Sequence, residues 1–122
     1  MKHRYSRRVA AVKRLLIAEI HGLAGRAAEL ARLLDDVAER AAREEGCLMF
    51  RVLRGDDLGE FVVLSSWRDE PALRSHYATA AYVRYRAAVG ELLARPSDVT
   101  VHHVAEILHA VDPNPPEPGL FG

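Results

Sequence analysis

Residues 47–67 read CLMFRVLRGDDLGEFVVLSSW, and the expected architecture follows from them. Residues 47–54 and 60–67 are rich in the apolar and aromatic side chains that favour β-strands. The five residues between them, Gly-Asp-Asp-Leu-Gly at 55–59, have the composition of a turn. Two strands joined by so short a turn pair antiparallel, so this segment predicts a β-hairpin.

A strand and a helix are expected before the hairpin. Residues 15–21, LLIAEIH, form a short apolar run that stops at Gly22, which indicates a strand. Residues 26–45 repeat apolar side chains at intervals of three and four, the pattern of a helix with one buried face. Gly46 follows and is expected to end that helix in a left-handed conformation.

A second helical region and a last strand are expected after the hairpin. Asp69 is suited to cap a helix. That helix is expected to end near Thr79, which is suited to cap a second helix over residues 80–94. Pro96 ends it, and the β-branched residues of 99–108 indicate a strand. The order β-α-β-β-α-β predicts a ferredoxin-like α+β domain with a four-stranded antiparallel sheet.

Length and charge predict one domain with two short extensions. The net charge of the 122 residues is zero, but residues 1–14 contain six of the 17 lysines and arginines and no acid. The rest of the chain is therefore acidic and repels phosphate, so nucleic-acid binding is not expected. We expect the domain over residues 15–111, between a basic arm (1–14) and a tail (112–122) that holds four of the six prolines.

The expected compartment is the cytoplasm. Cys47 is the one cysteine, so no internal disulfide can form, and a reducing environment is the simplest interpretation. No apolar run reaches the roughly 18 residues that span a bilayer. The residues after Arg7-Arg8 are too polar for an export signal. Neither a membrane partner nor export is therefore expected.

Three short motifs have characteristic positions in this order of elements. They are Gly46-Cys47-Leu48 after the first helix, Trp67-Arg68-Asp69-Glu70 at the end of the hairpin, and His76 nine residues beyond Trp67. Together they are similar to the pattern of the antibiotic biosynthesis monooxygenase superfamily, over roughly residues 15–108. Members pack the open faces of their sheets against each other, so the resemblance implies a homodimer that forms a dimeric α/β barrel.

The resemblance also implies a chemistry: a cofactor-independent monooxygenase that uses O₂ on a small aromatic substrate, quinol-like or polyketide-like, with no metal. Such a protein deprotonates and orients a substrate that itself passes an electron to O₂. His76 is the candidate general base, because histidine titrates near neutral pH. Haem-degrading members use residues that this sequence lacks at the matching positions, so haem is not expected. The candidate substrate-binding residues are Trp67, Tyr82, Tyr85, Arg86 and His21.

Several of these assignments also have a purely structural alternative. Trp67 and the tyrosines also suit an ordinary core, and His76 also suits a hydrogen-bonded helix position. Glu19 and His21 share one face of the first strand, with Ser65 expected nearby, which indicates a lined cavity or an interface.

Other functions remain open from the sequence. His102, Glu106 and His109 would share a face at metal-ligand spacing in a helix, but the strand expected there holds the first two about 13 Å apart. The alternatives to an oxygenase are an isomerase or a small-molecule-binding protein that uses the same pocket, and a non-catalytic dimeric interaction module.

Overall fold

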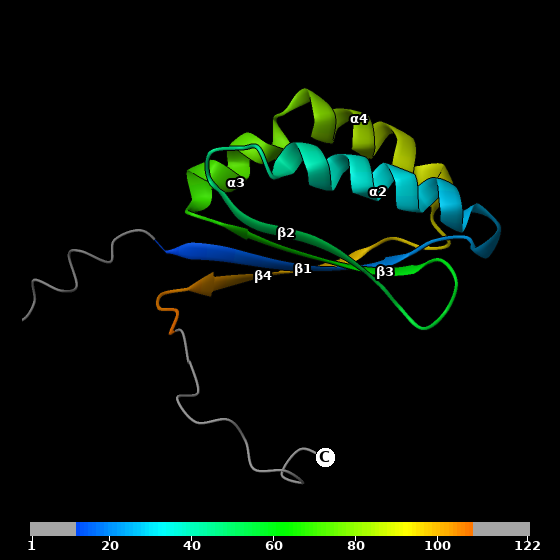
Figure 1. The fold of residues 1–122 in the computed structure, drawn as a ribbon, viewed down its shortest axis with the longest axis horizontal. Coiled ribbons are helices and arrows are strands. Elements are labelled where there is room, and N and C mark those ends of the chain that lie inside the picture. Colours follow the sequence, from blue (N-terminus) through cyan, green and yellow to red (C-terminus); the bar gives the residue numbers. More distant parts are fainter. Residues whose placement is uncertain (1–11, 109–122) are drawn as a thin grey trace, which may run out of the picture.

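The computed structural model describes residues 12–108, and it confirms the predicted order of elements and the ferredoxin-like α+β fold (Figure 1). The strands are β1 (Lys13–His21), β2 (Cys47–Arg54), β3 (Glu60–Trp67) and β4 (Asp98–Val104). The helices are α2 (Ala27–Ala41), α3 (Glu70–Tyr77) and α4 (Ala80–Val89), with 3₁₀ turns at Ala24–Arg26 and Gly90–Leu92.

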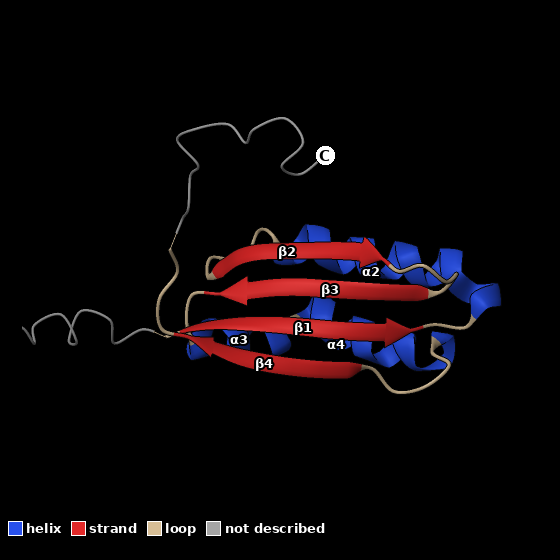
Figure 2. Ribbon diagram, turned by 90° about the horizontal axis from the view of Figure 1, so that it is seen from below, coloured by secondary structure: helices blue, strands red, loops and turns tan. Residues whose placement is uncertain are grey.

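The four strands form one antiparallel sheet in the order β2-β3-β1-β4. The central pair is β1 and β3, whose register sets Leu16 opposite Ser65 and Ile20 opposite Phe61. All three helices lie on one face of this sheet (Figure 1), and Figure 2 shows the other face, which no helix of the described chain covers. The side chains of β1 and β3 therefore divide between a helix-covered face and an open face.

The core fills the space between the helices and the covered face. Leu30 and Leu34 of α2 pack against Ile20, Phe61 and Val63, because the apolar stripe predicted for this helix faces the sheet. A second cluster surrounds the fully buried indole of Trp67, and its other buried members are Leu16, Ala41 and Leu73.

Two predicted helix caps are confirmed. The Oδ1 of Asp69 accepts a hydrogen bond of 2.9 Å from the backbone N–H of Ala72, which starts α3. The Oγ1 of Thr79 accepts one of 3.1 Å from the N–H of Tyr82, which starts α4. These two caps hold α3 and α4 as separate short helices, and α4 ends at Val89 rather than at residue 94.

The left-handed stop predicted at Gly46 is wrong. Within residues 12–108, Gly59 is the one residue with a positive φ, 91°. Helix α2 ends at Ala41, and residues 42–46 form a turn before β2. Gly46 serves a different purpose, because a Cβ there would collide with the Cβ of Ala72 at the start of α3. The glycine lets this turn approach α3 closely.

The ends of the domain differ from the expected boundaries. Lys13 and Arg14, which the sequence assigns to the basic arm, belong to β1, and β4 ends at Val104 rather than at residue 108. The other residues of the expected arm, up to residue 11, and the expected tail at 112–122 lie outside the described part of the chain. None of the helices within residues 12–108 has the length and apolar character needed to cross a bilayer.

Candidate active site

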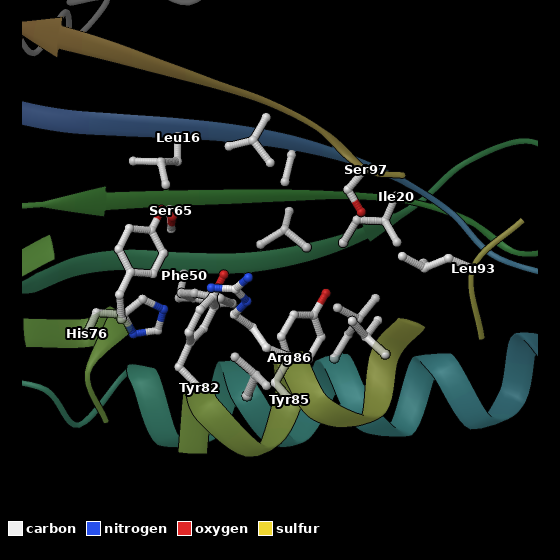
Figure 3. A pocket seen from close by; sticks show the side chains of 17 residues that line it. Leu16, Ile20, Phe50, Ser65, His76, Tyr82, Tyr85, Arg86, Leu93 and Ser97 are labelled. Atoms are coloured by element: carbon white, nitrogen blue, oxygen red, sulfur yellow. The ribbon is translucent and has the colours of Figure 1, made fainter. Parts of the chain in front are cut away.

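A cavity of about 420 Å³ lies between the covered face of the sheet and the helices. This volume is in the range of small-molecule sites. Figure 3 shows it as an elongated space with His76 at one end and Leu93 and Ser97 toward the other. Most of its lining is aliphatic or aromatic. Its polar lining residues are Ser65, His76, Tyr77, Tyr82, Tyr85, Arg86 and Ser97.

His76 is buried at the end of the cavity, between aromatic rings. The residue is 4% exposed, and its imidazole centroid lies 4.4 Å from that of Trp67 and 5.1 Å from that of Tyr82. The indole N–H of Trp67 donates a hydrogen bond of 3.1 Å to the Oγ of Ser65, which satisfies the buried indole. Rings on two sides therefore fix the orientation of the imidazole.

The Nδ1 atom of His76 faces the carboxylate of Glu44. The two carboxylate oxygens lie 3.0 Å and 3.2 Å from it. An ionised carboxylate can only accept hydrogen bonds, so this contact favours a proton on Nδ1, and a ring with that tautomer carries its lone pair on Nε2. No hydrogen bond to Nε2 is found within residues 12–108. The ring thus presents an unpaired acceptor to the cavity that it lines.

Glu44 was not among the predicted site residues. It lies 32 positions before His76 and in the turn after α2, so neither periodicity nor a motif connects the two. The one available signal is an acidic residue close to Gly46, the glycine that allows the turn to approach α3.

Two tyrosines of α4 form part of the wall opposite the sheet. Their ring centroids, in Tyr82 and Tyr85, lie 5.7 Å apart. Burial raises the pKa of Tyr85 to about 12, and the neighbouring Tyr82 adds to the increase. Burial also raises the pKa of Tyr82, while the positive charge of Arg86 lowers it. Both hydroxyls are therefore neutral near pH 7 and can donate hydrogen bonds into the cavity.

Arg86 is the one lining residue of the cavity that carries a permanent charge. No carboxylate within residues 12–108 forms a salt bridge with it, although other arginines, such as Arg26, Arg40 and Arg74, have such partners. Figure 3 shows Arg86 on α4 with Tyr82 and Tyr85. The arrangement can accommodate an anionic group on an otherwise apolar ligand.

The structure brings together His76, Tyr82, Tyr85 and Arg86, but it separates Trp67 and His21 from the cavity lining. Trp67 lies behind His76 as a core residue with no exposed surface. Its contribution to the site is the surface on which the imidazole rests.

His21 is on the open face of the sheet, because side chains alternate along β1 and Ile20 points into the core. Its Nδ1 lies 2.8 Å from the Oε1 of Glu60 on β3. The expected proximity of Ser65 to His21 is also wrong, since the register pairs Ser65 with Leu16 on the covered face.

One group of side chains among the described residues has potential metal ligands close together. Glu19, His21 and Asp98 place their ligand atoms within 4.8 Å of one another on the open face. The guanidinium of Arg95 lies 3.2 Å from the Nδ1 of His21 and already supplies positive charge there. The alternative helical site does not form, because His102 is in β4 and contacts the Oγ1 of Thr100 at 3.0 Å, while residue 109 lies outside the described part.

Comparisons with known proteins find relatives for most of the chain. Residues 14–88 match the family model described as "Antibiotic biosynthesis monooxygenase". The chain is 40% identical over 72 residues to "Putative monooxygenase Rv0793" of Mycobacterium tuberculosis, and the match covers 59% of this chain and 71% of that protein.

Solved structures agree with that match. The structure of Rv0793 has a TM-score of 0.70 and 33% identity over 82% of this chain and 96% of its own. A "putative antibiotic biosynthesis monooxygenase" from Caulobacter crescentus has a TM-score of 0.71 and 24% identity, covering 90% of this chain and 100% of its own. At that identity the second likeness concerns the fold alone.

Proposed function

Because the chain belongs to the antibiotic biosynthesis monooxygenase family, we propose that it is a cofactor-independent monooxygenase acting on a small aromatic, quinol-like or polyketide-like substrate with O₂. The observation that carries this proposal is the unpaired Nε2 of His76, a buried acceptor on an apolar cavity of about 420 Å³. A general base on a largely apolar pocket is what such chemistry requires of the protein.

The proposed reaction begins when Nε2 of His76 takes the proton of a phenol or an activated C–H group. The resulting anion passes one electron to O₂, and the two radicals combine at a ring carbon. The protonated Nε2 returns its proton to the resulting peroxide anion, and loss of water from this hydroperoxide then leaves a quinone or ketone. One oxygen atom enters the product, the other leaves as water, and the substrate supplies all the electrons. The protein contributes deprotonation, orientation and exclusion of bulk water.

The other cavity residues have positioning roles in this proposal. Arg86 pairs with the phenolate or with a carboxylate of the substrate, and Tyr82 and Tyr85 donate hydrogen bonds from neutral hydroxyls. Trp67 supports the imidazole of His76 from behind. His21 has no role at this site, because it lies on the opposite face of the sheet.

Oxygen uptake tests the proposal. Purified, chelator-treated protein is offered a panel of hydroquinones and anthrones, together with His76→Ala and a control, His103→Ala, that removes an exposed histidine of β4 outside the cavity lining. Uptake by the wild type and the control, but not by His76→Ala, supports the mechanism. Wild-type uptake that survives in His76→Ala excludes His76 as the base, and no uptake across the panel contradicts an oxygenase for these substrates.

An isomerase that uses the same pocket is the second candidate. It is favoured by the same unpaired Nε2, because proton transfer alone is enough to move a double bond. Substrate consumption without oxygen uptake identifies this activity. Ligand binding without turnover identifies a binding protein, and neither binding nor turnover favours an interaction module.

We also propose that two chains pair through the open face of the sheet. Its side chains include Leu15, Ile17, Val62 and Leu64, which are only partly buried in one chain. An apolar sheet face of this kind needs a cover, and a second copy related by a two-fold axis supplies one. Sedimentation equilibrium tests the pairing: a mass of twice 13.6 kDa is expected, and Leu64→Asp is expected to shift it toward the monomer.

We also propose the cytoplasm as the compartment, because the free thiol of Cys47 suits a reducing environment.

A further inference from the structure

The turn between α2 and β2 fixes the backbone of Glu44 on both sides. Its N–H donates to the carbonyl oxygen of Ala41 at 3.0 Å, and its own carbonyl accepts from the N–H of Cys47 at 3.0 Å. The carbonyl of Gly46 accepts from the N–H of Arg68 at 2.8 Å, which ties the turn to the segment before α3. Glu44 is therefore held where its side chain can reach α3.

The carboxylate of Glu44 is largely withdrawn from water. Its side chain is 20% exposed, whereas that of His76 is 6% exposed. A charge-assisted hydrogen bond gains strength when solvent is excluded. The adjacent Glu45 provides a contrast, because its side chain is 91% exposed and its salt bridge to Arg68 spans 3.9 Å. Two neighbouring residues of one type thus differ in burial and in partner.

The contact determines which ring nitrogen is available. The partner of one imidazole nitrogen sets the protonation of the other. Without an acceptor at Nδ1, the neutral ring of His76 would be free to carry its proton on Nε2, and the cavity would lose its base. After Nε2 takes a proton, the carboxylate also stabilises the imidazolium that forms, which is the role of the acid in a catalytic triad.

We infer that Glu44 is a positioning residue for His76: it keeps the proton on Nδ1 and so holds Nε2 ready to accept a proton from a ligand in the cavity. The catalytic use of Nε2 rests on the proposed function. The assignment of the tautomer rests only on the contact of Glu44 with His76.

Ring ¹⁵N chemical shifts of His76, assigned by comparison with His76→Ala, test the inference directly. In the neutral state of the wild type we expect a protonated Nδ1 and an unprotonated Nε2. Glu44→Ala removes the acceptor, so the proton is expected to move in part to Nε2. Glu44→Gln keeps an oxygen that can accept, so Nδ1 is expected to stay protonated. Wild-type protein with the proton on Nε2, or a Glu44→Ala spectrum identical to the wild type, would overturn the inference.

Glu45→Ala is the matched control, since it removes the same charge from the same turn without touching the imidazole. It is expected to leave the ¹⁵N shifts of His76 unchanged. Backbone amide spectra of each variant establish that the fold is retained. Should Glu44→Ala fail to fold, Glu44→Gln and the wild-type tautomer still decide the question, because a wild-type proton on Nε2 contradicts the inference by itself.

Kinetics separate this inference from the proposed function. With an oxidisable substrate, Glu44→Ala is expected to lower kcat about tenfold or more while KM changes little, because the base is misdirected and the pocket keeps its shape. If the ¹⁵N shifts behave as expected but nothing is oxidised, the oxygenase proposal fails and the role of Glu44 stands. If oxidation occurs and Glu44→Ala changes neither shifts nor kcat, the role of Glu44 fails and the oxygenase proposal stands.

Discussion

The imidazole of His76 rests on the indole of Trp67, with ring centroids 4.4 Å apart and planes 31° from parallel. Trp67 ends β3 and has no exposed surface, while His76 lies on α3 and lines the cavity. The contact therefore joins the core to the candidate site. A change in the core at this point is expected to alter both the stability and the chemistry of the domain.

Trp67→Ala is the first test of that connection. Loss of a fully buried indole leaves a void and is expected to reduce the free energy of unfolding by about 3–5 kcal/mol, measured by urea denaturation. Trp67→Phe keeps an aromatic surface beside His76 and should lose less. Ser65→Ala removes only the acceptor of the indole N–H and is expected to cost about 1–3 kcal/mol. If Trp67→Ala and Trp67→Phe reduce the free energy of unfolding equally, the void does not account for most of the lost stability.

Gly46→Ala tests the close approach of the turn to α3. The added Cβ meets the Cβ of Ala72, so the turn must move and carry Glu44 with it. We expect a loss of about 1–3 kcal/mol in the free energy of unfolding. Gly25→Ala is the control, because a Cβ there meets nothing within 4 Å and is expected to be neutral or slightly stabilising. Similar losses for both variants would contradict the assignment of the loss to the contact with Ala72.

The fold followed from local signals that act within a few residues. The alternation of apolar residues in β3 and the capping side chains of Asp69 and Thr79 are read in the sequence and recur in the structure. The end of α2 lacked such a signal, because Ala42 to Glu45 are ordinary helix formers and contacts with α3 set the turn instead.

Prediction of the candidate site from the sequence was less complete, because the site depends more on tertiary arrangement. Tyr82, Tyr85 and Arg86 share a segment of α4, so their common location followed from the sequence. The pairing of Glu44 with His76 did not, because a turn and a helix meet there. The location of His21 relative to Ser65 depends on the register of β1 against β3, for which no local residue is responsible.

The raised pKa of Tyr85 predicts a loss of folding stability at alkaline pH. Folding raises the pKa of its phenol from 10.0 to about 12, so the unfolded chain ionises first as the pH rises. The stabilising contribution is fully present below pH 10 and is lost between about pH 10 and 12, to the extent of roughly 2 kcal/mol. Urea denaturation of the wild type and Tyr85→Phe across this range measures it. The wild type is expected to lose stability relative to Tyr85→Phe as the pH rises, and a constant difference between the two would contradict the prediction.

The charge of Arg86 predicts that the cavity prefers anionic ligands. A guanidinium on an apolar cavity and without a carboxylate partner among the described residues is expected to favour an aromatic carboxylate over its neutral amide. Arg86→Gln removes the charge but keeps hydrogen-bond donors. It is expected to weaken binding of the carboxylate about tenfold or more, because hydrogen bonds to charged groups contribute about 1.5–3 kcal/mol, and to leave binding of the amide nearly unchanged. Isothermal titration calorimetry with both ligands measures the two affinities.

Arg84→Gln is the control for Arg86→Gln, since it removes the same charge from the same helix at an exposed position outside the cavity lining. If both variants weaken the carboxylate equally, the effect comes from the general electrostatic field of the domain, which high salt should screen. If only Arg86→Gln does so and the effect persists at high salt, the anion binds at the guanidinium of Arg86. Equal affinity of the wild type for carboxylate and amide would contradict any charge preference of this cavity.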